Sequence, residues 1–514
     1  MVQLKQAEGK MARYKHTEAE EGQGMFLTVN LKEQLLPGSF EHMLDGLVGG
    51  KIDVSMFDTN YRNDETGATA IPPAALIKLI IYGYSKGKMS SRGLWDLGKN
   101  NMVAKALTAD MEPHWTTIAD FISSNGERFK EVFVKVLAYC NELGLVGGQT
   151  FATDGLRLPS NASLDVTGTA EELGKRLKLY RRMAEKHIAK HQRKDAAGEV
   201  DKETERRFEE QQRKLNRKVE KISNFLETME RKEGKRGREI KSNVTDNESA
   251  LIHAPEGYIQ GYIGMAVSDR KEQVIVCAEA VGSANESEHF IRVLDKALDN
   301  MKSCGVTTPE GTKPVMLADN NYFGEENLKA CHEQGLEPIM PDENYKSRLG
   351  RTEKKRYEAS DFKYHEGEDY YECPAGKILM NKGSSTVPGS RTGKVYRASV
   401  ADCRLCPCNE KCMGHKKKPP KRPRGRSLFI SESNEPGSHC QVMREKLNEQ
   451  EYQDQYAYRI QIIEPVFANI SYSKGLDRFT LRGAVKVNGQ WQLYCIVHNL
   501  GKCLKTYNKE KGYG

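Results

Sequence analysis

Three acidic residues occupy positions where a carboxylate could do chemistry. Asp319 follows a short apolar run that begins at Val315, and Asp154 follows a β-prone run that begins at Thr150. Glu464 falls within an otherwise apolar patch. A carboxylate at the end of a central strand faces the crevice where α/β sheets bind ligands. A carboxylate among apolar residues must be paired, metal-bound or shifted in pKa, because burying a bare charge is costly.

If the chain brings these three acids together, they predict a site for two Mg²⁺ ions, with Mn²⁺ as a substitute. Mg²⁺ prefers oxygen ligands, keeps several waters and needs only one or two carboxylates per ion. Two ions about 3.5–4 Å apart clamp the attacking and leaving oxygens of an in-line phosphoryl displacement. Arg459, five residues before Glu464, could pair with a phosphate or hold a carboxylate.

Each acid also has a plainer interpretation. Asp319 suits a turn or a helix N-cap, and Asp154 followed by Gly155 suits a turn. Pro465 disfavours helical geometry at Glu464, which could therefore cap a helix or lie at a kink.

The elements between the acids decide whether they can meet. After Gly148 the pattern predicts a strand, a helical insertion, a hairpin of two strands, a helix, a strand, a helix and a strand. The hairpin is expected at 261–267 and 273–281, and the helix after it at 287–304. With a final helix, this is the order of an RNase H-like fold. Its first and fourth strands lie side by side, so Asp154 and Asp319 would approach each other.

The predicted fold class is α/β: an RNase H-like mixed sheet with flanking helices, joined to a helical N-terminal domain and two insertions. The predicted boundaries are 1–146 for a helical, DNA-binding N-terminal domain, 147–169 with 243–345 and 441–510 for the catalytic domain, 170–242 for a basic helical hairpin, and 346–440 for a cysteine-rich, basic insertion. The short N-terminal helices suit helix-turn-helix DNA binding and equally a plain bundle. The basic face of the hairpin suits a phosphate backbone or simple solvation.

Cysteines in the second insertion predict a structural zinc site. Cys403 and Cys406 form a C-x-x-C knuckle, Cys412 lies close by, and Cys373 follows a β-prone segment. Four thiolates from two knuckles are a common zinc ligand set. Six cysteines in the segment leave the set ambiguous, and free thiols are the alternative.

A run of basic residues interrupted by prolines comes directly after these cysteines. It would bind phosphate well, and its alternative is a solvated linker. The predicted DNA contacts are Lys416, Lys417, Lys418, Lys421, Arg422, Arg424 and Arg426, together with Arg459 and Lys474.

Length and composition set broad limits. The 514 residues suit about three domains, and the net charge of +8 is a mild excess. No apolar run approaches the roughly 20 residues that span a membrane, and the N-terminus lacks a signal-peptide pattern. Twelve cysteines in such a chain favour a reducing cytosol. We therefore expect a cytoplasmic protein with no membrane partner.

Taken jointly, the acidic motifs resemble those of bacterial insertion-sequence transposases of the DDE, RNase H-like superfamily. The resemblance extends from about Phe26 to Tyr507. The motifs that carry it are Thr153-Asp154-Gly155 with Asn161-Ala162-Ser163, Leu317-Ala318-Asp319-Asn320-Asn321-Tyr322, Glu464-Pro465-Val466-Phe467 with Asn469 and Leu481-Arg482-Gly483, and, for one branch, Cys373-Pro374-Ala375-Gly376 with the 403–412 cysteines.

The resemblance implies a bacterial enzyme that binds the terminal inverted repeats of its element, cleaves the ends with Mg²⁺ and joins 3′-hydroxyls to target DNA. Its partners would be double-stranded DNA and, for synapsis of two ends, a second copy of the chain; bound to DNA, it would associate with the nucleoid. Ser471 stands where related branches carry a lysine, and Lys474 is the candidate substitute. A zinc-containing DNA-binding protein with structural acids, or an RNase H-like nuclease without strand transfer, are the alternatives.

Overall fold

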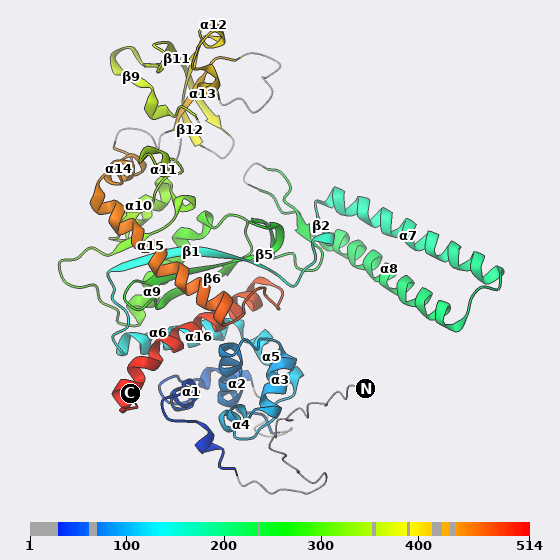
Figure 1. Ribbon diagram of the computed structural model, residues 1–514. Helices are drawn as coiled ribbons and strands as arrows, with labels where there is room; N and C mark the ends of the chain where they lie inside the picture. Colours follow the sequence, from blue (N-terminus) through cyan, green and yellow to red (C-terminus); the bar gives the residue numbers. More distant parts are fainter. Residues whose placement is uncertain are drawn as a thin grey trace, which may run out of the picture.

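The computed structural model describes residues 29–60, 69–234, 237–351, 356–387, 391–413, 424–431 and 437–513. A mixed sheet lies at the centre with helices against it, and a helical hairpin and a small second sheet project from this body (Figure 1). Among the described helices, none has the length and apolar character needed to cross a lipid bilayer.

The central sheet has the order β4-β5-β1-β7-β8, and β6 also pairs with β5. Its strands are β1 Thr150–Pro159, β4 Ala250–Ala254, β5 Gly257–Asp269, β6 Ile275–Val281, β7 Val315–Leu317 and β8 Glu337–Ile339. β1 runs antiparallel to β5 and parallel to β7, so the predicted adjacency of the first and fourth strands is confirmed. The hairpin of β5 and β6 is also confirmed, whereas β4 was not predicted.

The helices of the body are α9 Phe290–Ser303, α10 Glu325–Glu333, α11 Tyr345–Arg348, α14 His439–Lys446, α15 Gln450–Ala468 and α16 Ala484–Lys511. All except the short α11 fall in stretches that the apolar periodicity predicted to be helical. The last stretch has two breaks rather than the one predicted, at 447–449 and at 474–483 beyond a π-helical turn. α15 packs against β1 and β5, and α16 packs against β6.

The long final helix is fixed to the sheet by amide side chains. β6 pairs with β5 on one side, and its other backbone edge faces α16. Asn488 Oδ1 accepts from Ala280 N at 2.8 Å, and Gln492 donates to Ala278 O. Asn499 exchanges two hydrogen bonds with the backbone of Ile275, at 2.9 and 2.8 Å. These side-chain amides bond the backbone groups along the free edge of β6, which would otherwise be open to pairing with another strand.

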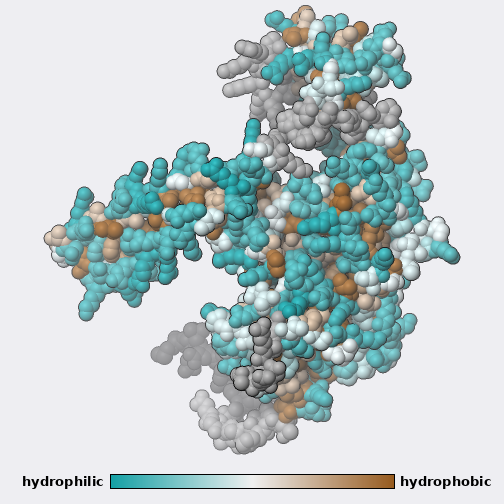
Figure 2. Space-filling view, turned by 180° about the vertical axis from the view of Figure 1, so that it is seen from behind, coloured by the Kyte–Doolittle hydropathy of each residue, from teal (hydrophilic) through white to brown (hydrophobic). Residues whose placement is uncertain are grey.

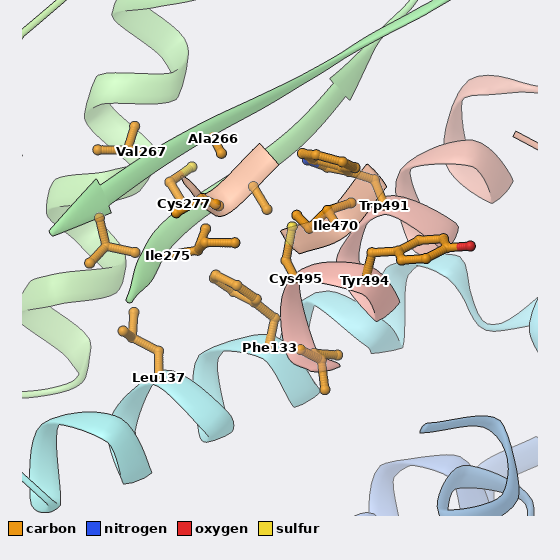
Figure 3. Close-up of a cluster of buried hydrophobic side chains, with 14 of the residues drawn as sticks. Phe133, Leu137, Ala266, Val267, Ile275, Cys277, Ile470, Trp491, Tyr494 and Cys495 are labelled. Carbon is orange, nitrogen blue, oxygen red and sulfur yellow. The ribbon is translucent and has the colours of Figure 1, made fainter. Parts of the chain in front are cut away.

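The N-terminal helices share the hydrophobic core of the sheet. They are α1 Phe40–Leu47, α2 Pro73–Ser85, α3 Ser91–Asn100, α4 Met102–Thr108, α5 Trp115–Ser124 and α6 Gly126–Glu142. Prolines open α2 and Ser90 caps α3, as predicted. α6 crosses α16 closely: a Cβ on Gly489 would lie 2.6 Å from the Cα of Gly126. Figure 3 shows side chains of α6, α16, β5 and β6 meeting in one buried cluster.

The segment after β1 forms a projecting arm. α7 Ala170–Ala196 and α8 Lys202–Thr228 pack against each other, and β2 Thr167–Gly168 pairs with β3 Ser242–Asn243 at the base (Figure 1). The turn lies where the sequence predicted it. The surface of the arm is mainly hydrophilic with hydrophobic patches (Figure 2). Its charges include the pairs Lys175–Glu171, Arg213–Glu209 and Lys214–Glu210.

The cysteine-rich segment folds around a second antiparallel sheet of order β13-β12-β11-β10-β9. Its strands are β9 Lys363–His365, β10 Tyr370–Glu372, β11 Ile378–Val387, β12 Arg391–Ala398 and β13 Ser427–Ser431, with the short helices α12 Val400–Arg404 and α13 Asn409–Met413. A small core with Leu379 and Tyr396 supports it. Of these strands, only the β-prone character of Tyr370 and Tyr371 was predicted.

Two local expectations about the acids were wrong. Asp154 does not end its strand, because β1 continues to Pro159 through its pairing with β5. Glu464 is neither an N-cap nor at a break, because α15 runs through Glu464 and Pro465. Proline removes the hydrogen bond to the carbonyl four residues earlier. Here Gln273 Nε2 donates to that carbonyl, Gln461 O, at 2.9 Å, which supplies the missing partner.

Candidate active site

Asp154 and Asp319 lie at the same level of two neighbouring parallel strands. The last pair between β1 and β7 joins Ala152 to Leu317, and each aspartate stands two residues beyond it. β7 ends at Leu317, so β1 has no partner on that side at Asp154. The charge of Asp154 is close enough to raise the pKa of Asp319, after the larger effect of burial. The structure therefore brings these two predicted acids together.

A third carboxylate, which the sequence did not predict, joins them. Glu286 lies at the start of the turn that leads into α9 and is 3% exposed. Asn321 Nδ2 donates to Glu286 Oε1 and to Asp319 Oδ2, at 3.1 Å each. Burial, followed by the charges of Asp154 and Asp319, raises the pKa of Glu286 to about 7. Like charges disfavour ionisation of their neighbours, so these three groups form one electrostatic unit.

Two arginines partly neutralise this acidic cluster. Arg459 on α15 donates from Nη1 to Asp154 Oδ2 at 2.8 Å, and both side chains are largely buried, 13% and 22% exposed. Arg157 lies 3.4 Å from Glu286 Oε1 and also donates to His253 O. Arg459 thus holds a carboxylate here, which is one of the two roles expected for it.

Hydrogen bonds from the backbone fix the orientation of both aspartates. Asp154 Oδ1 accepts from Gly155 N at 2.8 Å, and Asp319 Oδ1 accepts from Asn321 N at 2.9 Å. Asp319 therefore also caps the short turn 320–322, which was the plainer interpretation of this residue. The two roles are compatible, because each aspartate keeps a second oxygen that faces other side chains.

The predicted third acid, Glu464, stands apart in this structure. It is exposed on α15 and makes no hydrogen bond or ion pair with any residue that the structure describes. The helix turns by about 100° per residue, so a residue five positions after Arg459 points about 140° away from it. The carboxylates whose charges shift the pKa values of Glu286, Asp319 and Tyr322 are Asp154, Asp319 and Glu286, and Glu464 is not among them.

The donor set of the cluster suits a divalent cation. In the described part of the chain, no three His, Cys, Asp or Glu side chains already stand in ligand geometry for a metal. One oxygen of Glu286, Oε2, is buried without a hydrogen-bond partner in that same part. Oxygen-only ligands with excess negative charge suit Mg²⁺ or Mn²⁺ rather than softer metals. Asp154, Asp319 and Glu286 therefore fit such an ion by their chemistry.

The predicted DNA-contacting residues have different surroundings. Lys474 is half-buried, and burial followed by the charge of Lys86 lowers its pKa. Arg424 is exposed, whereas Arg426 is 7% exposed and donates to the carbonyls of Tyr357 and Cys412. Arg426 is thus hydrogen-bonded within the cysteine-rich segment. Lys416, Lys417, Lys418, Lys421 and Arg422 lie outside the described residues.

Four thiols surround a small cavity in the cysteine-rich unit. The cavity, of about 20 Å³, is lined by Cys373, Cys403, Cys406 and Cys412, among other residues. Burial raises the pKa of Cys412, and the other three thiols raise it further. Backbone amides donate to two sulfurs: Lys377 N to Cys373 Sγ at 3.3 Å and Arg426 N to Cys403 Sγ at 3.2 Å. Such bonds orient thiolates around a metal.

Two remaining cysteines of this segment lie elsewhere. Cys408 is not part of the cavity lining and interacts with the hydroxyl of Tyr357, and Cys440 is buried on α14 beside Glu325. The four cysteines at the cavity are those that the knuckle spacing favoured.

Two segments of the chain match known protein families. Residues 372–504 match the family described as transposase DDE domain, and residues 29–124 match the family described as transposase domain (DUF772). A search of curated proteins found no match. Both matches are to transposase families, and they support the resemblance of the motifs to insertion-sequence DDE transposases. The DDE domain implies an enzyme of transposition that acts on DNA, in a family that generally uses divalent metal ions.

Glu286 is the residue at this site that sequence reasoning missed. It precedes a helix, directly after Asn285, where an acidic residue is ordinary because of the helix dipole. The available signal was positional: this helix follows β6, the third strand of the predicted order, and its start lies near the two aspartates.

Proposed function

We propose that this transposase binds the terminal inverted repeats of its element, hydrolyses the phosphodiester at each end and joins the 3′-hydroxyls to target DNA. The observation that carries the proposal is the meeting of Asp154 and Asp319 two residues beyond a shared strand pair, beside a third carboxylate. The strand order agrees with an RNase H-like fold, which supports the same chemistry.

Asp154, Asp319 and Glu464 are the proposed catalytic acids. Divalent ions bound there would supply charge stabilisation for the displacement, through two-ion chemistry. The carboxylates of Asp154 and Asp319 are oriented by the amides of Gly155 and Asn321. Glu464 sits one and a half turns beyond Arg459 on α15, so its part in the site requires a local change in α15 when DNA binds.

Arg459 has two proposed roles in this reaction. It neutralises Asp154 in the metal-free protein, at 2.8 Å. Released from that carboxylate, its planar guanidinium would pair with a phosphate, for which arginine is well suited. Lys474 and the basic residues around Arg424 are proposed to contact the DNA backbone, and the projecting arm of α7 and α8 extends the reach of the protein along DNA (Figure 1).

We further propose that the thiols of Cys373, Cys403, Cys406 and Cys412 hold a structural zinc ion. The small cavity between them and the amide-to-sulfur hydrogen bonds support this ligand set. A zinc ion would cross-link the two ends of a unit whose own hydrophobic core is small. Synapsis of two ends implies that the active form is a homodimer.

Incubation of the protein with DNA carrying the element ends and Mg²⁺ tests the proposal. The wild type should produce nicked ends and joined products, and Asp154→Asn and Asp319→Asn should each abolish both while still binding the ends. Glu464→Gln should do the same. Cleavage without joining would instead indicate a nuclease, and no nicking with any divalent metal would indicate a zinc-containing DNA-binding protein whose acids are structural.

A further inference from the structure

We propose that Glu286 is a ligand of the divalent cation at this site, together with Asp154 and Asp319. This inference rests on the proposed function in one respect, namely that the acidic cluster binds a divalent cation. It assigns a role to a residue that lies outside the three acidic motifs, on the turn between β6 and α9.

The Glu286 carboxylate is buried and only partly hydrogen-bonded. The residue is 3% exposed, yet its Oε2 has no hydrogen-bond partner in the described part of the chain. A buried polar atom without a partner is rare in folded proteins, because its desolvation is not compensated. The buried hydroxyl of Tyr322 interacts with this carboxylate, and burial, followed by the charge of Glu286, raises the pKa of Tyr322. A neutral hydroxyl does not neutralise the charge of Glu286.

Oε2 of Glu286 points toward β1. A Cβ atom on Gly155 would lie 2.2 Å from Glu286 Oε2, so this oxygen lies beside the backbone that follows Asp154. The other oxygen, Oε1, shares the amide of Asn321 with Asp319. Glu286 thus faces both aspartates, and its unpartnered oxygen faces the strand that carries Asp154.

The plainer alternative is a structural ion pair with Arg157. That contact is 3.4 Å long, reaches only Oε1 and comes from a side chain that is 36% exposed. An exposed partner contributes little to stability, which does not offset the burial of a carboxylate next to two others. A cation between the three carboxylates would supply the positive charge that the cluster lacks, and Oε2 would be one of its ligands.

The test measures metal binding by the full-length protein without DNA. Mn²⁺ is the probe, and free Mn²⁺ is followed by electron paramagnetic resonance during titration. Glu286→Gln should weaken Mn²⁺ binding at least tenfold, as should Asp154→Asn. Glu288→Gln is the matched control, because it removes the same charge two residues further along the same turn from an exposed side chain. It should bind Mn²⁺ within twofold of the wild type.

Thermal unfolding of the same proteins separates ligation from folding. Metal-free Glu286→Gln should melt at the same temperature as the wild type or higher, because a buried carboxylate is removed from a like-charged cluster. It should lose the rise in melting temperature that Mn²⁺ gives the wild type. If this variant does not fold, Glu286→Asp, which keeps the charge on a shorter side chain, takes its place and should bind Mn²⁺ more weakly.

Several results would overturn the inference. They are Mn²⁺ binding by Glu286→Gln within twofold of the wild type, no Mn²⁺ binding by the wild type, or loss of folding in both variants at position 286. Strand cleavage is scored separately. A wild type that binds Mn²⁺ through Glu286 but never cuts DNA would contradict the proposed function alone, whereas a wild type that cuts DNA while Glu286→Gln binds Mn²⁺ normally would contradict this inference alone.

Discussion

Gly155 and Glu286 fit against each other at the centre of the acidic cluster. A Cβ atom at position 155 would stand 2.2 Å from Glu286 Oε2 and 2.6 Å from Ile263 Cγ2. The glycine that follows Asp154 therefore does not make a turn, which is what an Asp-Gly pair suggests in isolation. It lies inside β1 and leaves space for a carboxylate from another element.

Replacing Gly155 with alanine should displace the Glu286 carboxylate. We expect a loss of about 1–3 kcal/mol in the free energy of unfolding, because overpacking forces neighbouring groups to move. Cleavage of element-end DNA should fall at least tenfold. Urea unfolding and the cleavage assay measure the two effects.

Gly174→Ala is the control for that substitution. A Cβ there meets nothing within 4 Å, and the residue lies inside helix α7. Alanine at such a position should stabilise the protein by about 0.5–1 kcal/mol. Wild-type cleavage by Gly155→Ala would show that the close fit at position 155 is unimportant.

The pair of Arg459 and Asp154 should dominate the stability of the metal-free site. Arg459→Ala leaves the largely buried carboxylate of Asp154 without its partner. We expect this change to lower the free energy of unfolding by about 3 kcal/mol. In the Asp154→Asn background the same change should lower the free energy of unfolding much less, because residue 154 then carries no charge that needs a partner. A double-mutant cycle measured by urea unfolding gives the coupling, and additive effects would contradict the assigned pairing.

Much of the central sheet could be predicted because its strands are apolar runs between clear turn signals. The run at Val315 and the hairpin that turns near Asp269 carry this pattern. β4 escaped prediction because it has only five residues and is separated from β5 by two residues, Pro255 and Glu256. The second sheet escaped because β12 mixes charged residues and glycine with few apolar ones, and because the apolar runs of β11 and β13 are only three residues long.

The candidate site was predictable only where acids follow strands. Asp154 and Asp319 could be paired from strand order, since parallel neighbours place their carboxyl ends together. Glu286 could not, because its burial depends on Gly155, Asn321 and α9, which converge only in three dimensions. The interruption that Pro465 suggested does not occur, because Gln273 supplies the hydrogen bond that proline removes.

The cysteine assignment predicts which thiols matter for zinc content. Cys403→Ser should lower the zinc bound by the purified protein and destabilise the unit of β9 to β13. Cys408→Ser should retain wild-type zinc, because Cys408 lies outside the cavity lining. Elemental analysis after dialysis measures the stoichiometry. Equal zinc in both variants, or none in the wild type, would contradict the assigned ligand set.

His498 should make the fold sensitive to acid. Burial lowers its pKa to about 4, and its ring is bonded to the Gln273 carbonyl at 2.9 Å. The unfolded chain takes up a proton near pH 6.5 that the folded protein refuses until about pH 4, so stability present above pH 6.5 is lost as the pH falls. The free energy of unfolding should fall by about 3 kcal/mol for a pKa shift of this size.

Urea unfolding of His498→Gln between pH 7.5 and 4.5 checks this effect. The variant should lose less stability than the wild type over that range. His253→Gln, at an exposed position, should keep the wild-type pH dependence. Parallel pH curves for His498→Gln and the wild type would assign the acid sensitivity to other groups.

A crystal structure of the protein bound to element-end DNA in Mn²⁺ examines the metal site itself. Anomalous scattering locates Mn²⁺ without reference to side-chain positions. We expect peaks between the carboxylates of Asp154 and Asp319, within coordination distance of an oxygen of each and of Glu286. Anomalous peaks remote from both aspartates, or DNA ends bound with no metal near them, would contradict catalysis at this cluster.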